Sequence, residues 1–269
     1  MRIVEHFIKG KSSPKKCEDA LVVTEHFIAV IDGVTSKSDF TYQGQTTGKL
    51  ASKIITQQLE CLPEDATVQT FITEVNARFE EFYEKVEFPY NKMEKGLQAV
   101  CAVYSKYFNE IWLIGDCQVS VDGQVYLNPK KSDDILSEFR SLVLRIWEKE
   151  EEVDETQKRW VRELILPWIL NATAFANDDT TEYGYACING EPIPEKLIRT
   201  IALGKDASHE VILTSDGYPA VKSSLQETEE YLKYILQTDP DCYKFYKSTK
   251  GIQEGNISFD DRTYVKFYT

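Results

Sequence analysis

Apolar and polar positions follow two different periods along the first third of the chain. Residues 20–31 form two short runs of apolar and β-branched residues, interrupted by the polar residues 24–26. This pattern predicts a β-hairpin. Apolar residues then recur at helical spacing over residues 46–59 and again over residues 71–86, where charged residues occupy the opposite face. The pattern therefore predicts two strands followed by two helices.

The period changes to two between residues 96 and 126. Three strand-like runs cover residues 97–104, 110–114 and 119–126, and Asp122-Gly123 within the last run is a tight-turn signal. No glycine-rich phosphate loop follows any of these runs. We therefore expect an antiparallel meander here rather than a nucleotide-binding βαβ unit.

The remainder of the chain is predicted to hold a helical block, several strands and one further helix. The helical block covers about residues 132–170, and the charged run at 148–152 inside it is interpreted as a solvated helix face or a connection. Strands are predicted at residues 183–188, 198–202, 211–214 and 263–268, and the capping-box pattern Ser224-Leu225-Gln226-Glu227 predicts a helix start. Because no internal repeat or linker interrupts the sequence, we expect residues 1–269 to form a single domain with a layered α+β fold.

The charge balance narrows the range of partners. The 269 residues include 44 acidic and 31 basic side chains, which give a formal net charge of −13. Such a surface repels nucleic acid and anionic membranes, so neither is expected as a partner. No run approaches the ~20 apolar residues that span a bilayer, the first residues do not resemble a leader, and the six cysteines include no close pair. These features predict a cytoplasmic protein with reduced thiols.

The informative acidic residues share one kind of position, the end of a predicted buried strand. Asp32, Asp116 and Asp216 follow such a strand, and Glu18-Asp19 and Asp260-Asp261 precede one. Carboxylates on different strand ends can converge at one edge of a sheet, where their oxygens suit hard divalent cations. Glycine follows Asp32 and Asp216, which permits a sharp turn and lets a backbone carbonyl join the coordination. A single Asp-Gly pair is more often only a turn, so the inference depends on all these acids together.

The order of the motifs resembles that of the metal-dependent protein phosphatases of type 2C (the PPM family). The chain is similar to a divergent bacterial-type member of that family. The motifs are Glu18-Asp19-Ala20, Ile31-Asp32-Gly33-Val34, Gly115-Asp116, Thr214-Ser215-Asp216-Gly217 and Asp260-Asp261-Arg262-Thr263. The resemblance covers residues 17–269, essentially the whole chain. It implies a four-layer α-β-β-α sandwich, in which two antiparallel sheets pack face to face between outer helices.

The resemblance also implies two Mn²⁺ or Mg²⁺ ions at one edge of the sandwich. Asp32, Asp216 and Asp260 would be the catalytic metal ligands, with Asp32 bridging both ions. The other groups carried over by motif are the Gly33 carbonyl as a ligand of one ion, Glu18 as the holder of metal-bound water, and Asp19 and Asp261 as orienting residues behind the ligands.

The reaction that the resemblance implies is hydrolysis of phosphoserine or phosphothreonine in a phosphoprotein substrate. Two divalent ions ~3.5–4 Å apart would bridge a water, lower its pKa and direct it in line at phosphorus, without a phosphoenzyme. They would also offset charge on the phosphoryl oxygens in the transition state. Cys17 and Cys117 lie near the acidic motifs in the sequence and are interpreted as packing residues.

The sequence departs from the family pattern at several positions. An arginine that often precedes the Glu-Asp pair and contacts phosphate is absent, and Lys15 or Lys16 is expected to substitute for it as a point charge. Ala220 and the region of Met93 stand where acids for a third, weaker metal are often found. A third metal site is therefore not expected.

Two other functions stay open at this point. The same fold could serve as a pseudophosphatase, a binding or regulatory module, because the arginine and the third-metal acids are missing. Alternatively, the acids could be turn residues only, in an antiparallel α+β protein that binds no metal. The presence of Asp32, Asp216 and Asp260 together favours the enzyme over both alternatives.

Overall fold

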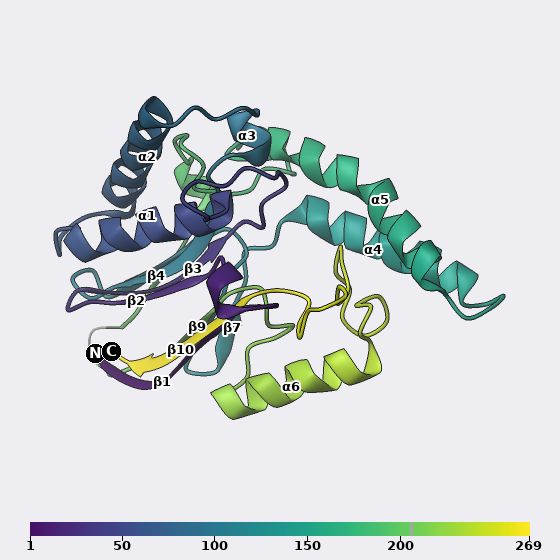
Figure 1. The fold of residues 1–269 in the computed structure, drawn as a ribbon. Helices are drawn as coiled ribbons and strands as arrows, with labels where there is room; N and C mark the ends of the chain where they lie inside the picture. Colours follow the sequence, from purple (N-terminus) through teal and green to yellow (C-terminus); the bar gives the residue numbers. More distant parts are fainter. Residues whose placement is uncertain (205–206) are drawn as a thin grey trace.

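The computed structural model describes residues 1–204 and 207–269. Its strands form two five-stranded sheets, in the orders β1-β10-β9-β6-β7 and β2-β3-β4-β5-β8. Neighbouring strands in both sheets are antiparallel. The sheets pack face to face, with α1 and α2 covering one of them and α6 covering the other (Figure 1). The predicted α+β sandwich of four layers is therefore confirmed.

The bounds of the elements are as follows. The strands are β1 (Arg2–Lys9), β2 (Ala20–Val23), β3 (Phe27–Gly33), β4 (Ala99–Ser105), β5 (Glu110–Ile114), β6 (Gln118–Val121), β7 (Gln124–Tyr126), β8 (Arg199–Ala202), β9 (Glu210–Thr214) and β10 (Arg262–Tyr268). The helices are α1 (Thr47–Cys61), α2 (Val68–Lys85), α3 (Lys92–Lys95), α4 (Lys131–Trp147), α5 (Glu155–Asn171) and α6 (Leu225–Thr238). None of the described helices has the length and apolar composition of a membrane-spanning segment.

β3 lies between two hydrophobic cores, since its two faces are buried against different layers. Phe27, Ala29 and Ile31 belong to the cluster that includes apolar residues of α1 and α2. Ile28 and Val30 point the opposite way, into the cluster between the two sheets. Successive side chains of a strand point to opposite faces, so one uninterrupted apolar run serves both cores. This double burial fixes the strand that ends in Asp32.

The helical block predicted at 132–170 is a helical hairpin of α4 and α5, which extends away from the sandwich (Figure 1). The charged run at 148–152 lies in the exposed connection between the two helices. Asp154 begins α5 through a capping box with Gln157. The hairpin thus contributes an additional layer beside the sheet edge rather than a layer over a sheet face.

The meander predicted over residues 96–126 is wrong in its last part. β4 and β5 pair as expected, but β5 continues to β8 on its other side. At Gly115, whose φ is +80°, the chain leaves this sheet, and the β6–β7 hairpin joins β9 in the opposite sheet. A positive φ suits glycine because it has no Cβ. The tight turn predicted at Asp122-Gly123 is confirmed, and it divides residues 119–126 between the two strands of this hairpin.

Two further differences concern single strands. Residues 183–188 are not a strand, since they make only isolated bridges, Ala99 to Ile188 and Ala176 to Tyr185. β1 was not predicted, although it pairs with β10 along nearly its whole length. Its inward positions include Glu5, while Val4 and Ile8 are exposed, so the strand lacks the regular alternation of apolar and polar residues.

The loop after α6 (residues 239–250) is shaped by two buried polar side chains. Asp239 is 1% exposed, and its carboxylate accepts the backbone N–H groups of residues 243–246 at 2.7–3.3 Å. Arg140 of α4, which is 3% exposed, donates from Nη1 to three carbonyl oxygens within residues 241–248 at 2.8–3.2 Å. The helical hairpin therefore fixes the course of this loop.

Replacing Asp239 by alanine would leave four backbone N–H groups without the buried carboxylate that accepts them. We expect Asp239→Ala to lower the free energy of unfolding by about 2–4 kcal/mol. Urea unfolding followed by circular dichroism measures this loss. Asp241→Ala is the matched control, because the Asp241 carboxylate makes an ion pair with Lys158 and its loss should cost less than about 1 kcal/mol. Equal losses in the two variants would contradict the role of Asp239.

Candidate active site

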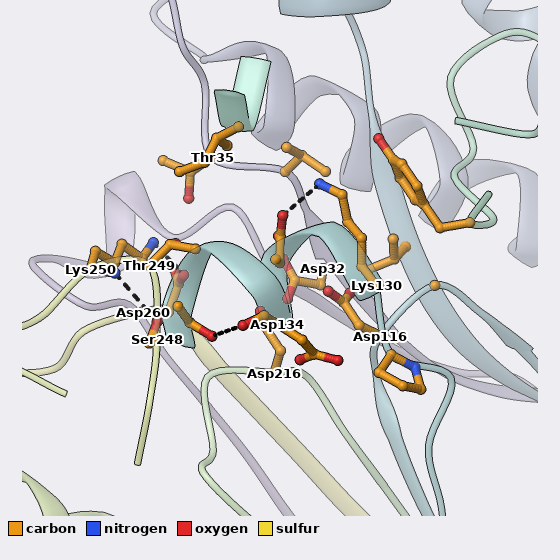
Figure 2. A pocket seen from close by; sticks show the side chains of 18 of the residues that line it. Asp32, Thr35, Asp116, Lys130, Asp134, Asp216, Ser248, Thr249, Lys250 and Asp260 are labelled. Atoms are coloured by element: carbon orange, nitrogen blue, oxygen red, sulfur yellow. Dashed lines mark hydrogen bonds and ion pairs between the residues drawn. The ribbon is translucent and has the colours of Figure 1, made fainter. Parts of the chain in front are cut away.

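Four aspartates from four strand ends line one cavity. Asp32 lies at the end of β3, Asp116 follows β5, Asp216 follows β9 and Asp260 precedes β10. β3 and β5 both run antiparallel to β4, and β9 runs antiparallel to β10. The ends that carry the acids therefore face the same edge of the sandwich. The cavity has a volume of about 340 Å³, and Figure 2 shows the four side chains around it.

The carboxyl groups of Asp32 and Asp216 are hydrogen-bonded to each other. Burial, together with the charges of Asp19 and Asp216, raises the pKa of Asp32 well above its ordinary value. Burial and the charge of Asp260 also raise the pKa of Asp216. Asp116 follows the same trend, because burial and Asp216 raise its pKa to about 7. These acids thus oppose each other's ionisation, as closely placed carboxylates do in a poorly solvated site.

Asp260 differs from the other three aspartates because ammonium groups surround it. Lys11 Nζ lies 2.8 Å from Asp260 Oδ1, and Lys250 Nζ lies 2.5 Å from Asp260 Oδ2. Although burial opposes ionisation, Lys250 and Lys11 lower the pKa of Asp260 below its usual range. Figure 2 shows the Lys250 contact at the side of the cavity formed by Thr249 and Ser248. Asp260 is therefore ionised, with both carboxylate oxygens already bonded.

The other predicted acids are buried behind the cavity. The Asp261 carboxylate accepts the backbone N–H groups of Lys11 at 2.7 Å and Glu18 at 2.9 Å. Glu18 Oε1 accepts the hydroxyl of Thr46 at 2.6 Å, and Asp19 Oδ2 accepts a hydroxyl of β10 at 2.8 Å. Burial raises the pKa of Asp19 to about 8 and also raises that of Glu18. These contacts tie the segment before β2 to the start of β10.

The glycines after Asp32 and Asp216 allow close backbone approach. A Cβ on Gly33 would lie 2.3 Å from the carbonyl oxygen of Gly48, and a Cβ on Gly217 would lie 1.8 Å from that of Asp261. Both distances are too short for any side chain. The sequence predicts a sharp turn at both glycines; in the structure, the tight packing of one site segment on another also requires them.

Several cations around the cavity were not singled out from the sequence. Lys37 lies in the loop between β3 and α1, Arg162 lies on α5, and Lys250 ends the 239–250 loop. Burial and the positive charges of Lys250 and Arg162 lower the pKa of Lys37 to about 8. These residues belong to no motif of regular spacing, so only the tertiary structure brings them together.

The predicted phosphate contacts, Lys15 and Lys16, lie exposed on the turn at residues 14–16. They are not among the residues that line the cavity. Lys11, four residues earlier, instead places its ammonium group beside the acids, 2.8 Å from the hydroxyl of Thr35. A phosphate role for Lys15 or Lys16 stays a prediction.

The donor set suits a hard divalent cation at Asp32 and Asp216. Carboxylate and carbonyl oxygens are the preferred ligands of Mg²⁺ and similar ions, and a cation would relieve the repulsion that raises the pKa values of these two acids. Asp260 fits less well, because lysines occupy both of its oxygens. Within residues 1–204 and 207–269, no three His, Cys, Asp or Glu side chains are grouped as a ready-made metal site.

Comparison with known proteins gives matches among solved structures alone, since no protein-family model and no curated protein matches the chain. The serine/threonine phosphatase PstP/Ppp of Mycobacterium tuberculosis is 13% identical, with a TM-score of 0.47 over 99% of this chain and 98% of that one. A structure of the PstP catalytic domain with two manganese ions is 13% identical, with a TM-score of 0.46 over 100% of both chains. Stp1 from Staphylococcus aureus is 13% identical, with a TM-score of 0.49 over 99% of this chain and 94% of that one. These proteins are serine/threonine phosphatases, the class whose motif order this sequence resembles. The fold of this chain is assigned from its own two sheets, independently of these matches.

Gly217→Ala tests the tight packing beside Asp216. Since the added Cβ would overlap the Asp261 backbone, the variant should lose at least about 3 kcal/mol of unfolding free energy. Gly204→Ala is the matched control, because the nearest atom to its Cβ would be the His209 side chain at 3.3 Å. Urea unfolding of both variants measures the difference, and a Gly217→Ala protein as stable as wild type would refute the packing argument.

Lys37→Met tests the electrostatic cost of the buried cations. The pKa of Lys37 is lowered to about 8 in the folded state, so its charge destabilises the fold below pH 8 and the cost disappears as the pH rises towards the ordinary lysine value. In a buffer without phosphate or sulfate at pH 7, we expect the variant to gain about 1–3 kcal/mol of unfolding free energy.

The gain from Lys37→Met should shrink above pH 8, because wild-type Lys37 then becomes neutral. Unfolding in urea at pH 7 and pH 10 measures the change. The control is Lys53→Met, which removes an exposed charge of α1 and should change stability by less than about 0.5 kcal/mol. A gain independent of pH would contradict the electrostatic explanation.

Proposed function

We propose that this protein is a phosphatase that depends on Mn²⁺ or Mg²⁺ and hydrolyses phosphoserine or phosphothreonine in phosphoproteins. The observation that carries the proposal is the convergence of Asp32, Asp116, Asp216 and Asp260 on one cavity from four separate strand ends. The same acids occur in the motif order that resembles type 2C phosphatases. The matched phosphatase structures are compatible with this reading.

Asp32, Asp216 and the Gly33 carbonyl would hold the divalent cation, with Glu18 positioned nearby. When bound, the metal would supply an activated water nucleophile and offset negative charge on the phosphoryl group. Burial and the neighbouring carboxylates raise the pKa values of Asp32 and Asp216, so a proton held by this pair would have to leave before metal binds. Because protonation competes with metal binding, metal affinity should fall as the pH is lowered.

The chain itself supplies orientation and positive charge. Thr46 donates its hydroxyl to Glu18 Oε1 and so fixes that carboxylate. Lys37 and Arg162 line the cavity, where their charges would attract a phosphoryl group. Burial raises the pKa of Cys17 to about 12 and that of Cys117 well above its ordinary value. Neither thiol is therefore ionised near neutral pH, so neither is a good candidate for a nucleophile.

A second candidate function is a pseudophosphatase that binds phosphoproteins without hydrolysing them. The observation that favours it is the pairing of Asp260 with Lys11 and Lys250, because a ligand held by two ammonium groups is not free to bind metal. The two candidates differ in turnover, so both can be tested in one experiment.

The test is hydrolysis of para-nitrophenyl phosphate and of a phosphothreonine peptide, with Mn²⁺, with Mg²⁺ and with EDTA. An enzyme should be active with metal and inactive with EDTA. Asp216→Asn should lose at least ~100-fold in kcat, because it removes a metal ligand. Asp122→Asn on the exposed β6–β7 turn is the matched control and should retain activity.

The outcomes separate the candidates. Peptide binding without turnover in any metal would favour the pseudophosphatase. Full activity of Asp216→Asn would refute the proposed site, whatever the substrate.

A further inference from the structure

The contacts of Asp260 bear on how many metal ions this site can hold. Its two oxygens receive one ammonium group each, from Lys11 at 2.8 Å and from Lys250 at 2.5 Å. The three side chains are only 15–17% exposed. Lys11 Nζ also lies 3.8 Å from Asp261 Oδ2 and 3.9 Å from Glu18 Oε2. Positive charge is thus already present where the motif order would place a second divalent cation.

Lys250 reaches Asp260 through a loop that is rigidly held. Asp239 binds four backbone N–H groups of that loop, and Arg140 binds three of its carbonyl oxygens. Arg162 of α5 adds a hydrogen bond from Nη1 to the carbonyl oxygen of Thr249, at 2.9 Å. The residue directly before Lys250 is therefore fixed by the helical hairpin.

Lys11 is fixed by an independent set of contacts. Its N–H donates to Asp261 Oδ1 at 2.7 Å, its carbonyl oxygen accepts the N–H of Ile257 at 2.8 Å, and its ammonium group also donates to Thr35. Two separate parts of the chain thus direct a lysine at the same carboxylate. A surface lysine held by chance would lack these backbone anchors.

We propose that the ammonium groups of Lys11 and Lys250 take the place of the second divalent cation, so that the chain binds one Mn²⁺ or Mg²⁺ ion, through Asp32 and Asp216. This inference rests on the proposed metal dependence. It departs from the two ions implied by the family resemblance.

The charges explain why the lysines would exclude the second ion. Two ammonium groups carry the charge of one divalent cation, so Asp260 is neutralised without metal. A metal ion that bound either oxygen of Asp260 would compete with the ammonium group already bonded to that oxygen. Displacing that group would leave a partly buried positive charge beside the ion. Among the residues that the structure describes, no ammonium group is bonded to Asp32 or Asp216, and a cation there would relieve repulsion between the carboxylates.

The experiment is a titration of the metal-free full chain with Mn²⁺ by isothermal calorimetry, with native mass spectrometry to count bound ions. We expect one ion for wild type and none at that site for Asp216→Asn. Lys11→Met with Lys250→Met keeps both apolar stems but frees Asp260, so the double variant should bind two ions. The count does not depend on catalytic activity.

Two control variants separate charge from loop structure. Lys250→Arg retains the positive charge and should still bind one ion. Lys244→Met removes a lysine of the same loop, whose partner is Glu148 at the end of α4, and should also bind one ion. Circular dichroism of each metal-free variant verifies that it is folded.

The results distinguish failure of this inference from failure of the proposed function. Two ions on wild type, or one ion on the folded double variant, would overturn the replacement by lysines and leave a metal-dependent enzyme possible. No bound ion on wild type, together with no hydrolysis in any metal, would refute the proposed function and this inference with it.

Discussion

The carboxylate of Asp261 connects the two ends of the chain at the site. It accepts the backbone N–H groups of Lys11 and Glu18, so the segment before β2 is held against the start of β10. Each bond joins residues more than 240 positions apart in sequence. The positions of Lys11, Glu18 and Asp260 relative to one another all depend on these two hydrogen bonds, and a buried charged acceptor makes them strong.

The remaining contacts of the site reduce the repulsion between its acidic side chains. A sandwich that gathers this many acids at one edge must limit their repulsion, and the chain does so in two ways. Asp32 and Asp216 share a hydrogen bond and have raised pKa values, whereas lysines keep Asp260 ionised. The helical hairpin contributes to the second solution, because Arg140 and Arg162 fix the loop that carries Lys250. An element that looks peripheral in Figure 1 therefore shapes the electrostatics of the cavity.

The acids could be found from the sequence because each lies next to an apolar run. The antiparallel pairing of the strands then places these acids at the same edge of the sandwich. The cations could not be found in this way. The position of Lys250 depends on Asp239, at the start of the loop, and on Arg140, which lies in α4. The same limit applies to strands. Residues 183–188 are apolar enough for a strand but find no partner strand, and β1 turns Glu5 inward, where it accepts the N–H of Leu225. Local pattern predicts burial well, and it predicts pairing only when the partner is nearby in sequence.

The pairing of β1 with β10 has a consequence for how the molecule assembles. Arg2 lies opposite Tyr268, so this part of the sheet joins the first strand to the last. Contacts of such long sequence separation are expected to form late, because the entropy cost of closing a large loop precedes the stabilisation that they give. β3 and β4 are neighbours at much shorter separation and can pair early. Asp32 on β3 can thus be in place before Asp260 and Asp261 are, and the cavity is expected to stay open on one side until β10 pairs with β1.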